Sequence, residues 1–292
     1  MFLATTHAPE TAAAAEAAAE HAETLDPLSH IFNSQYWELT HGLRLDLGAL
    51  LPLPTIRIGS LSIDLSLSLH VLMLWIAAAV LWLLLRTAAR CEEAHVPRGR
   101  LRNFFEAIVV FLRDEVVYNV MGPEVGRRYM PFLMTLFFFI LFNNLLGLVP
   151  GMATATGNLN VTGTLAVFTL VMTQGSGIRE HGLAGHLRSL VPPGMPILLV
   201  PVMLPIEIMG MFTKPFALTV RLFANMIAGH IIILAFFGLI FSLSLKSIFW
   251  SVLPWAGAVA ISAFEIFVGF LQAFIFVFLS TIFIHQAVHP EH

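Results

Sequence analysis

The sequence predicts an all-α, polytopic membrane protein with about five transmembrane helices and one amphipathic surface helix. Of its 292 residues, 58% are hydrophobic and only 11% are charged. Soluble domains have about 45–50% apolar and about 25% charged residues. In addition, the chain contains apolar runs of the length that a helix needs to cross about 30 Å of hydrocarbon.

The first 64 residues are expected to form a polar, acidic region outside the membrane domain, which then covers residues 65–292. This region has eight acidic residues against Arg44 and Arg57. Its Ala- and Glu-rich beginning lacks the positive start and apolar core of a signal peptide. We therefore expect a solvated tail, with export depending on the first membrane helix.

Residues 65–85 are almost purely apolar and predict the first span, which ends at Arg86 and Arg90. Eight of the fifteen basic residues lie between Arg86 and Arg128. The positive-inside rule places that segment in the cytoplasm. The N-terminus is then outside, and counting the later turns places the C-terminus in the cytoplasm.

Residues 101–120 predict an amphipathic helix on the cytoplasmic membrane surface. Packing of this helix on a partner protein is nearly as well supported. One face carries Arg102, Glu106 and Arg113. The other carries Leu101, Phe104, Phe105, Ile108, Leu112 and Val116.

Two further spans are expected in the middle of the chain. Residues 129–149 return outward and carry Asn143 and Asn144, and a Pro-Gly turn follows. Asn160 is expected to cap an inward helix that ends near residue 173. Residues 174–194, with two arginines, are expected to form a cytoplasmic loop.

The last two apolar segments, 197–245 and 247–287, are unusually long. At about 1.5 Å per residue, the first exceeds one perpendicular span. It must be tilted, kinked at a proline or folded as a hairpin. The second contains one acidic residue, Glu265.

Arg221 is the most informative residue, because it lies inside an apolar segment. A charged group at the bilayer centre costs about 2.5–3.5 kcal/mol on insertion scales and is a functional-site hypothesis by default. An arginine side chain does not escape this cost by losing its proton. An ion pair with Glu265 or Glu207 is the structural alternative to a functional role.

Other polar residues lie at different depths in the same two segments. Asn225 shares the helix face of Arg221, whereas His230 lies nine residues after Arg221 and faces the other side. Glu265 and Gln272 are seven residues apart on one face. Hydrogen bonding between helices is an equally good interpretation for Asn225 and Gln272. The layout is typical of a proton pathway.

No signal for a cofactor, metal or nucleic-acid site is present in the sequence. The single cysteine, Cys91, excludes a Cys-cluster metal site. No phosphate loop, nucleophile motif or nucleic-acid motif occurs, so no nucleotide site is expected on this chain.

Three stretches together resemble subunit a of the rotary F-type ATP synthase. The stretch PIEIMGMFTKPFALTVRLFANMIAGH is highly specific, and FEIFVGFLQAFIFVFLS and FNNLLGLVPG resemble other parts of the family. The resemblance covers residue 65 to the C-terminus. It implies that the last two helices are long, tilted and packed along a partner ring.

The resemblance also implies partners and residue roles. The partners would be the ring of c subunits, the peripheral-stalk b subunits, the rest of the ATP synthase and membrane lipid. Arg221 would be the essential arginine that faces the ring carboxylates. Polar residues near Arg221 or in the proton half-channels would be Asn225, Gln272, Glu207, His230 and Glu265, with Asn143 and Asn144 as external-channel candidates.

This chain departs from many bacterial family members at three positions. They carry an acid where it has His230 and a histidine where it has Glu265. The exchange suggests that the two residues are neighbours in space. Many members also carry an acid at the position of Gly147.

Two rival interpretations remain. The first is a self-contained secondary transporter or ion channel, which would use Arg221 to anchor an anionic substrate. The second is a purely structural membrane scaffold.

Overall fold

The computed structural model describes the strands between residues 36 and 63, and then residues 68–89, 100–149, 152–190, 196, 198–244 and 248–290. The Ala- and Glu-rich beginning of the chain and Cys91 lie outside these residues. Two short antiparallel hairpins come first, in the predicted external region. They are formed by β1 (Tyr36–Thr40) with β2 (Leu43–Asp46), and by β3 (Ile56–Ile58) with β4 (Leu61–Ile63).

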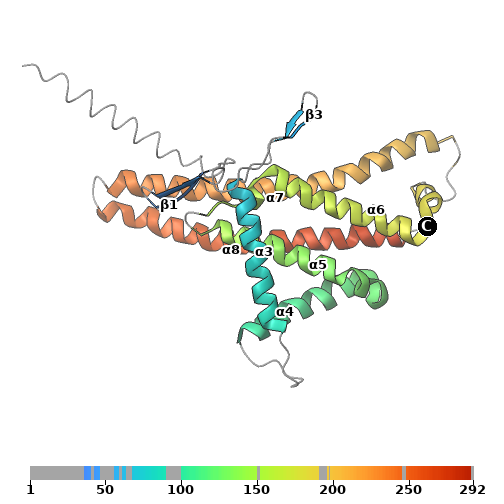
Figure 1. The fold of residues 1–292 in the computed structure, drawn as a ribbon, viewed down its shortest axis with the longest axis horizontal. Coiled ribbons are helices and arrows are strands. Elements are labelled where there is room, and N and C mark those ends of the chain that lie inside the picture. Colours follow the sequence, from blue (N-terminus) through green and yellow to red (C-terminus); the bar gives the residue numbers. More distant parts are fainter. Residues whose placement is uncertain are drawn as a thin grey trace, which may run out of the picture.

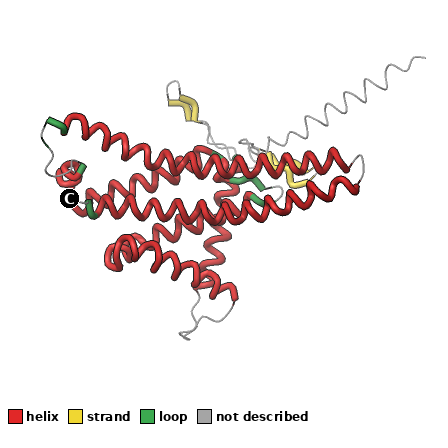
Figure 2. The backbone as a smooth tube through the Cα atoms, turned by 180° about the vertical axis from the view of Figure 1, so that it is seen from behind, coloured by secondary structure: helices red, strands yellow, loops and turns green. Residues whose placement is uncertain are grey.

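The membrane part is helical throughout its regular elements, which confirms the predicted fold class for this part of the chain (Figures 1 and 2). Within the described residues, five helical segments are long and apolar enough to cross a membrane, the predicted number. The elements are α3 (Leu69–Ala89), α4 (Arg100–Phe111), η1 (Leu112–Tyr118), α5 (Asn119–Gly147), η2 (Ala155–Gly157), α6 (Leu159–Ser189), α7 (Val200–Ser244) and α8 (Ile248–Val288).

The predicted amphipathic helix is divided between α4 and the π-helical segment η1. Phe105, Leu112 and Val116 of its apolar face are buried, as the spacing predicts, but Phe104 is 63% exposed. The chain then changes direction at Gly122, whose φ of 75° and ψ of 162° lie outside the helical region. This conformation is essentially restricted to glycine, so α5 begins its apolar course after Gly122.

Two sequence-based expectations for α6 are wrong. Its N-cap is Asn158, whose side chain accepts a hydrogen bond of 2.9 Å from the backbone N–H of Asn160. Asn160 was the expected cap, but it is already inside the helix. The helix also continues to Ser189 and turns a corner at Gly182, with φ 70° and ψ 167°. Most of the expected loop 174–194 is therefore helical.

Helix α7 is one continuous helix of 45 residues rather than a hairpin, and α8 has 41 residues. At about 1.5 Å per residue, each is more than 60 Å long, about twice the hydrocarbon thickness. Figure 1 shows α7 and α8 running lengthwise and crossing α3 steeply. A helix of this length fits a bilayer only if it is strongly tilted.

The main core lies along α8, which packs against α5, α6 and α7, and α6 also packs on α7. Its largest fully buried side chains include Phe137, Phe138 and Phe276. Helix α7 contributes only a narrow inner stripe of Leu218, Leu222 and Met226. These residues recur every fourth position, which is one helix face, so most of the α7 surface remains outside the core.

Candidate functional site

Arg221 lies on the outward face of α7 and is exposed. The neighbouring Leu222 is buried, because it belongs to the inner stripe of the helix. Among the residues that the structure describes, no acidic side chain is within ion-pair distance of Arg221. The alternative of a static pair with Glu265 or Glu207 is therefore not seen.

Two uncharged polar residues accompany Arg221 on the two long helices. Asn225 lies one turn further along α7 and is half-buried. Gln272 of α8 is 7% exposed. Both can bind water or an ionised partner through an amide group, without neutralising the charge of Arg221.

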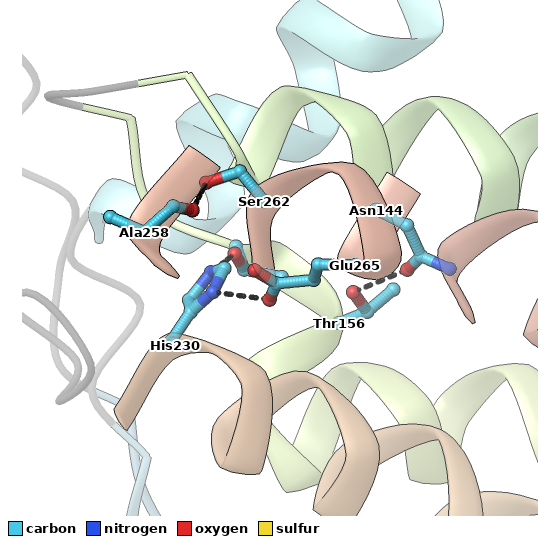
Figure 3. A network of polar contacts seen from close by, with 7 residues as sticks. Asn144, Thr156, His230, Ala258, Ser262 and Glu265 are labelled. Atoms are coloured by element: carbon cyan, nitrogen blue, oxygen red, sulfur yellow. Dashed lines mark hydrogen bonds and ion pairs between the residues drawn. The ribbon is translucent and has the colours of Figure 1, made fainter. Parts of the chain in front are cut away.

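His230 and Glu265 are in direct contact, although 35 residues separate them in the chain. The Nδ1 atom of His230 lies 2.9 Å from Oε1 of Glu265 (Figure 3). The Glu265 side chain is 4% exposed and that of His230 is 18% exposed. The other carboxyl oxygen of Glu265, Oε2, is buried and has no hydrogen bond within the described part of the chain. A proton can be added there without breaking the contact to His230.

Gly229 makes room for this contact. A Cβ atom at position 229 would lie 2.8 Å from Cδ of Glu265 and would also overlap its Oε1. Real Cβ atoms essentially never approach so closely. The absence of a side chain at Gly229 therefore allows Glu265 of α8 to reach α7 beside His230.

A second set of polar contacts joins α5 to α8 and to η2. Asn144 Nδ2 donates to the Gly269 carbonyl at 3.0 Å, one turn after Glu265. The Thr156 hydroxyl donates to Asn144 Oδ1 at 2.7 Å. Figure 3 shows Asn144 and Thr156 close to the His230–Glu265 pair. Asn143 instead donates to the Phe139 carbonyl of its own helix at 2.7 Å, so it is not joined to this set.

Thr154 and Thr156 are site residues that the sequence interpretation missed. Thr154 contacts the Nε2 atom of His230 through its hydroxyl. Both threonines are buried, with exposures of 3% and 0%. The only signal for them was the short polar run TATG between two apolar spans, which is also typical of an ordinary turn.

Glu207 lies far from the His230–Glu265 pair and lines a separate cavity of about 380 Å³. Lys214 also lines it and donates to Gln286 Oε1 of α8 at 3.2 Å. His186 of α6 shares the cavity and hydrogen-bonds Gln174 Oε1 through Nε2 at 2.7 Å. The cavity lies toward the ends of α6 and α8 and combines one acidic, one basic and several neutral polar groups.

The family model for the ATP synthase A chain matches residues 71–285. The chain belongs to the ATP synthase subunit a family. Subunit a of Myxococcus xanthus is 48% identical over 79% of this chain and 75% of its own length. Subunit a of Chloroherpeton thalassium is 45% identical over 92% of this chain and 79% of its own length. Subunit a of Chlorobium phaeobacteroides is 47% identical over 82% of this chain and 71% of its own length.

Membership of the subunit a family confirms the resemblance that the sequence motifs indicated. It makes the chain a proton-translocating stator subunit in the membrane sector of an F-type ATP synthase. Such a subunit is a membrane component of the complex, in agreement with the five apolar helical segments. The polar residues of α7 and α8 can then be considered in relation to proton movement.

Proposed function

We propose that Arg221 is the fixed positive charge that faces the carboxylates of a rotating c ring and separates two proton half-channels. The observation that carries the proposal is the outward position of Arg221, with no acidic partner in the described residues. A charged group at the bilayer centre costs about 2.5–3.5 kcal/mol on insertion scales. A carboxylate on another chain would offset that cost.

The outward surface of α7 supports contact with a ring of apolar helices. This surface is apolar on both sides of Arg221, and contiguous exposed apolar area of this kind is typical of protein or lipid contacts. A ring packed here would bring each carboxylate past Arg221 in turn. The exposed residues of α7 include Val202, Ile206, Met209, Phe212, Phe216, Ile231, Ile232 and Phe237.

The His230–Glu265 pair, with Asn144 nearby and Asn143 as a further candidate, is proposed as the external half-channel. His230 follows Arg221 by nine residues, or about 13.5 Å along the helix. Imidazole and carboxyl groups exchange protons readily, and their hydrogen bond provides a path between them. Oε2 of Glu265 is the atom that would receive the incoming proton.

The cavity at Glu207 is proposed as the cytoplasmic half-channel. Glu207 precedes Arg221 by fourteen residues, or about 21 Å along the helix. The two proposed half-channels are therefore on opposite sides of Arg221 along α7. Asn225 and Gln272 would hold the ring carboxylate or water near the arginine.

This arrangement accounts for coupling by electrostatics. A proton from the external half-channel neutralises a ring carboxylate, which can then enter lipid, whereas a charged carboxylate cannot without a large cost. The ring must turn before the proton reaches the Glu207 side. Arg221 cannot relay the proton directly, because it does not deprotonate. Each charge crossing is driven by about 2.3 kcal/mol per 100 mV.

The proposed orientation has the N-terminus outside the cell and the C-terminus in the cytoplasm of a bacterial inner membrane. Basic residues concentrated between the first two spans support it. The c ring, the peripheral-stalk b subunits and the rest of the ATP synthase are the proposed partners, together with membrane lipid.

The test is Arg221→Ala in the complete ATP synthase. We expect at least a tenfold loss of ATP-driven proton pumping in inverted membrane vesicles, the effect of about 1.4 kcal/mol or more on the coupled step. The chain should still copurify with the ring. Arg179→Ala is the control, because Arg179 is an exposed arginine of α6. The complex that carries Arg179→Ala should pump protons as fast as the unmodified complex.

Coupled pumping retained by Arg221→Ala would refute the role of Arg221. Ion transport by the isolated chain in liposomes, without a ring, would instead support the self-contained transporter or channel.

A further inference from the structure

Both ring nitrogens of His230 are in contact with side chains from other segments. Nδ1 faces Oε1 of Glu265 on α8 at 2.9 Å. Nε2 contacts the hydroxyl of Thr154, which lies in the connection between α5 and α6. The imidazole is therefore held between an acidic group and a hydroxyl group that the sequence separates by 111 residues (265 − 154).

The chemistry of these contacts determines which hydrogen bonds can form. An ionised Glu265 can only accept, so Nδ1 of His230 carries a hydrogen and donates it. In a neutral imidazole Nε2 is then an acceptor, and the Thr154 hydroxyl donates to it. In the imidazolium form Nε2 carries a hydrogen and donates to the Thr154 oxygen.

A hydroxyl group can change from donor to acceptor by rotating its hydrogen alone. Thr154 can therefore remain bonded to His230 in both protonation states without moving a heavy atom. A valine has nearly the same shape but can make neither hydrogen bond. Because leaving a buried polar group without a hydrogen bond is unfavourable, the Thr154 hydroxyl should hold the imidazole ring in place as its charge changes.

The backbone around Thr154 supports this position. The Thr154 carbonyl accepts from the N–H of Gly157 at 3.0 Å, which closes the η2 turn. A Cβ atom at Gly147 of α5 would lie 2.6 Å from Cβ of Thr154 and 2.9 Å from its Cα. Only a residue without a side chain leaves space for the threonine at that point. Gly147 thus accommodates Thr154.

We propose that Thr154 is a positioning residue for His230: its hydroxyl fixes the orientation and tautomer of the imidazole against Glu265 while protons pass through the pair. The inference rests on the proposed external half-channel. It adds a hydroxyl-bearing residue to the two titratable residues that the motifs indicate.

The experiment compares Thr154→Val and Thr154→Ser in the complete ATP synthase, by ATP-driven proton pumping in inverted vesicles. We expect Thr154→Val to lower the initial pumping rate by about tenfold, and Thr154→Ser to stay within about twofold of the unmodified complex. The control is Thr162→Val. Thr162 is also fully buried, but its hydroxyl donates only to backbone carbonyls at the start of α6, those of Asn158 and Leu159. The pumping rate of the Thr162→Val complex should therefore equal that of the unmodified complex.

Assembly is measured by copurification with the ring. If Thr154→Val does not assemble, Thr154→Ala replaces it, because alanine adds no bulk. Normal pumping by the assembled valine or alanine variant would overturn the proposal, as would a serine variant as defective as the valine variant. Arg221→Ala is measured in parallel. If Arg221→Ala lowers pumping but Thr154→Val does not, only the proposed role of Thr154 is refuted. If Arg221→Ala pumps normally, the proposed function on which the role of Thr154 rests is refuted.

Discussion

At the scale of single residues, the site depends on glycines as much as on charged groups. Gly229 allows Glu265 to approach α7, and Gly147 allows Thr154 to approach α5. In each case the glycine faces a polar side chain that contacts His230. The position of His230 is therefore determined by close approaches of helices, in addition to its own hydrogen bonds.

Gly229→Ala should disturb the His230–Glu265 contact. In an open helix position the change would stabilise the protein by about 0.5–1 kcal/mol. Here the added Cβ overlaps the carboxyl group at the flexible end of Glu265, which would have to move away from its place beside His230. We expect slower proton pumping in inverted membrane vesicles.

Gly238→Ala is the matched control, because a Cβ at this position of α7 meets nothing within 4 Å. Equal pumping rates for the two variants would show that the close approach at Gly229 has no effect on proton transfer.

At the scale of elements, two glycines set corners near the beginning of α5 and near the end of α6. Gly122 and Gly182 have φ values of 75° and 70° with ψ near 160°. Each separates a core helix from the helical turns that precede or follow it. The corner at Gly122 follows η1, whose Val116 and Val117 are buried in the core.

Gly122→Ala should destabilise the protein by about 1–3 kcal/mol, the cost of a non-glycine residue in this backbone region. Space is not the reason, since a Cβ at position 122 meets nothing within 4 Å. The measurement is the thermal midpoint of the detergent-solubilised complex. Gly175→Ala, at an open helical position of α6, should leave the midpoint unchanged or raise it. Equal effects of both variants would contradict the backbone explanation.

At the scale of the whole molecule, the arrangement leaves α7 on the outside of its own subunit. Helix α8 packs against α5, α6 and α7, whereas α7 adds only one inner stripe to the core and is covered on one side. Figure 2 shows α7 and α8 extending beyond the crossing with α3. Two long helices with an uncovered apolar surface on α7 fit the proposed packing against the side of a c ring.

Five candidate spans among the described residues predict that residues 1 and 292 lie on opposite sides of the membrane, and the basic residues predict which of them is inside. In inverted vesicles, whose cytoplasmic face is outward, protease should remove a tag attached after residue 292. A tag attached before residue 1 should be protected until detergent is added. Removal of both tags from intact vesicles would contradict the predicted orientation.

Several features could be predicted from the sequence because they depend on residues close together in the chain. Apolar run length predicted the spans, and helical spacing predicted that Arg221 and His230 face different sides of α7. The cap of α6 was misplaced by two residues, since Asn158 and Asn160 are both good capping residues. The helical turns after Gly182 were missed because a glycine and polar residues are also typical of loops.

The sequence by itself determined the membrane architecture, the depth order of the polar groups along α7 and the family. Hydropathy and periodicity act along single helices, and a charge such as Arg221 is conspicuous in any apolar run. Only the tertiary structure decided that Glu265 and Thr154 hold the two nitrogens of His230, and that Arg221 has no acidic partner among the described residues. These facts depend on how closely distant helices pack, which is set by side-chain volume at positions such as Gly229 and Gly147.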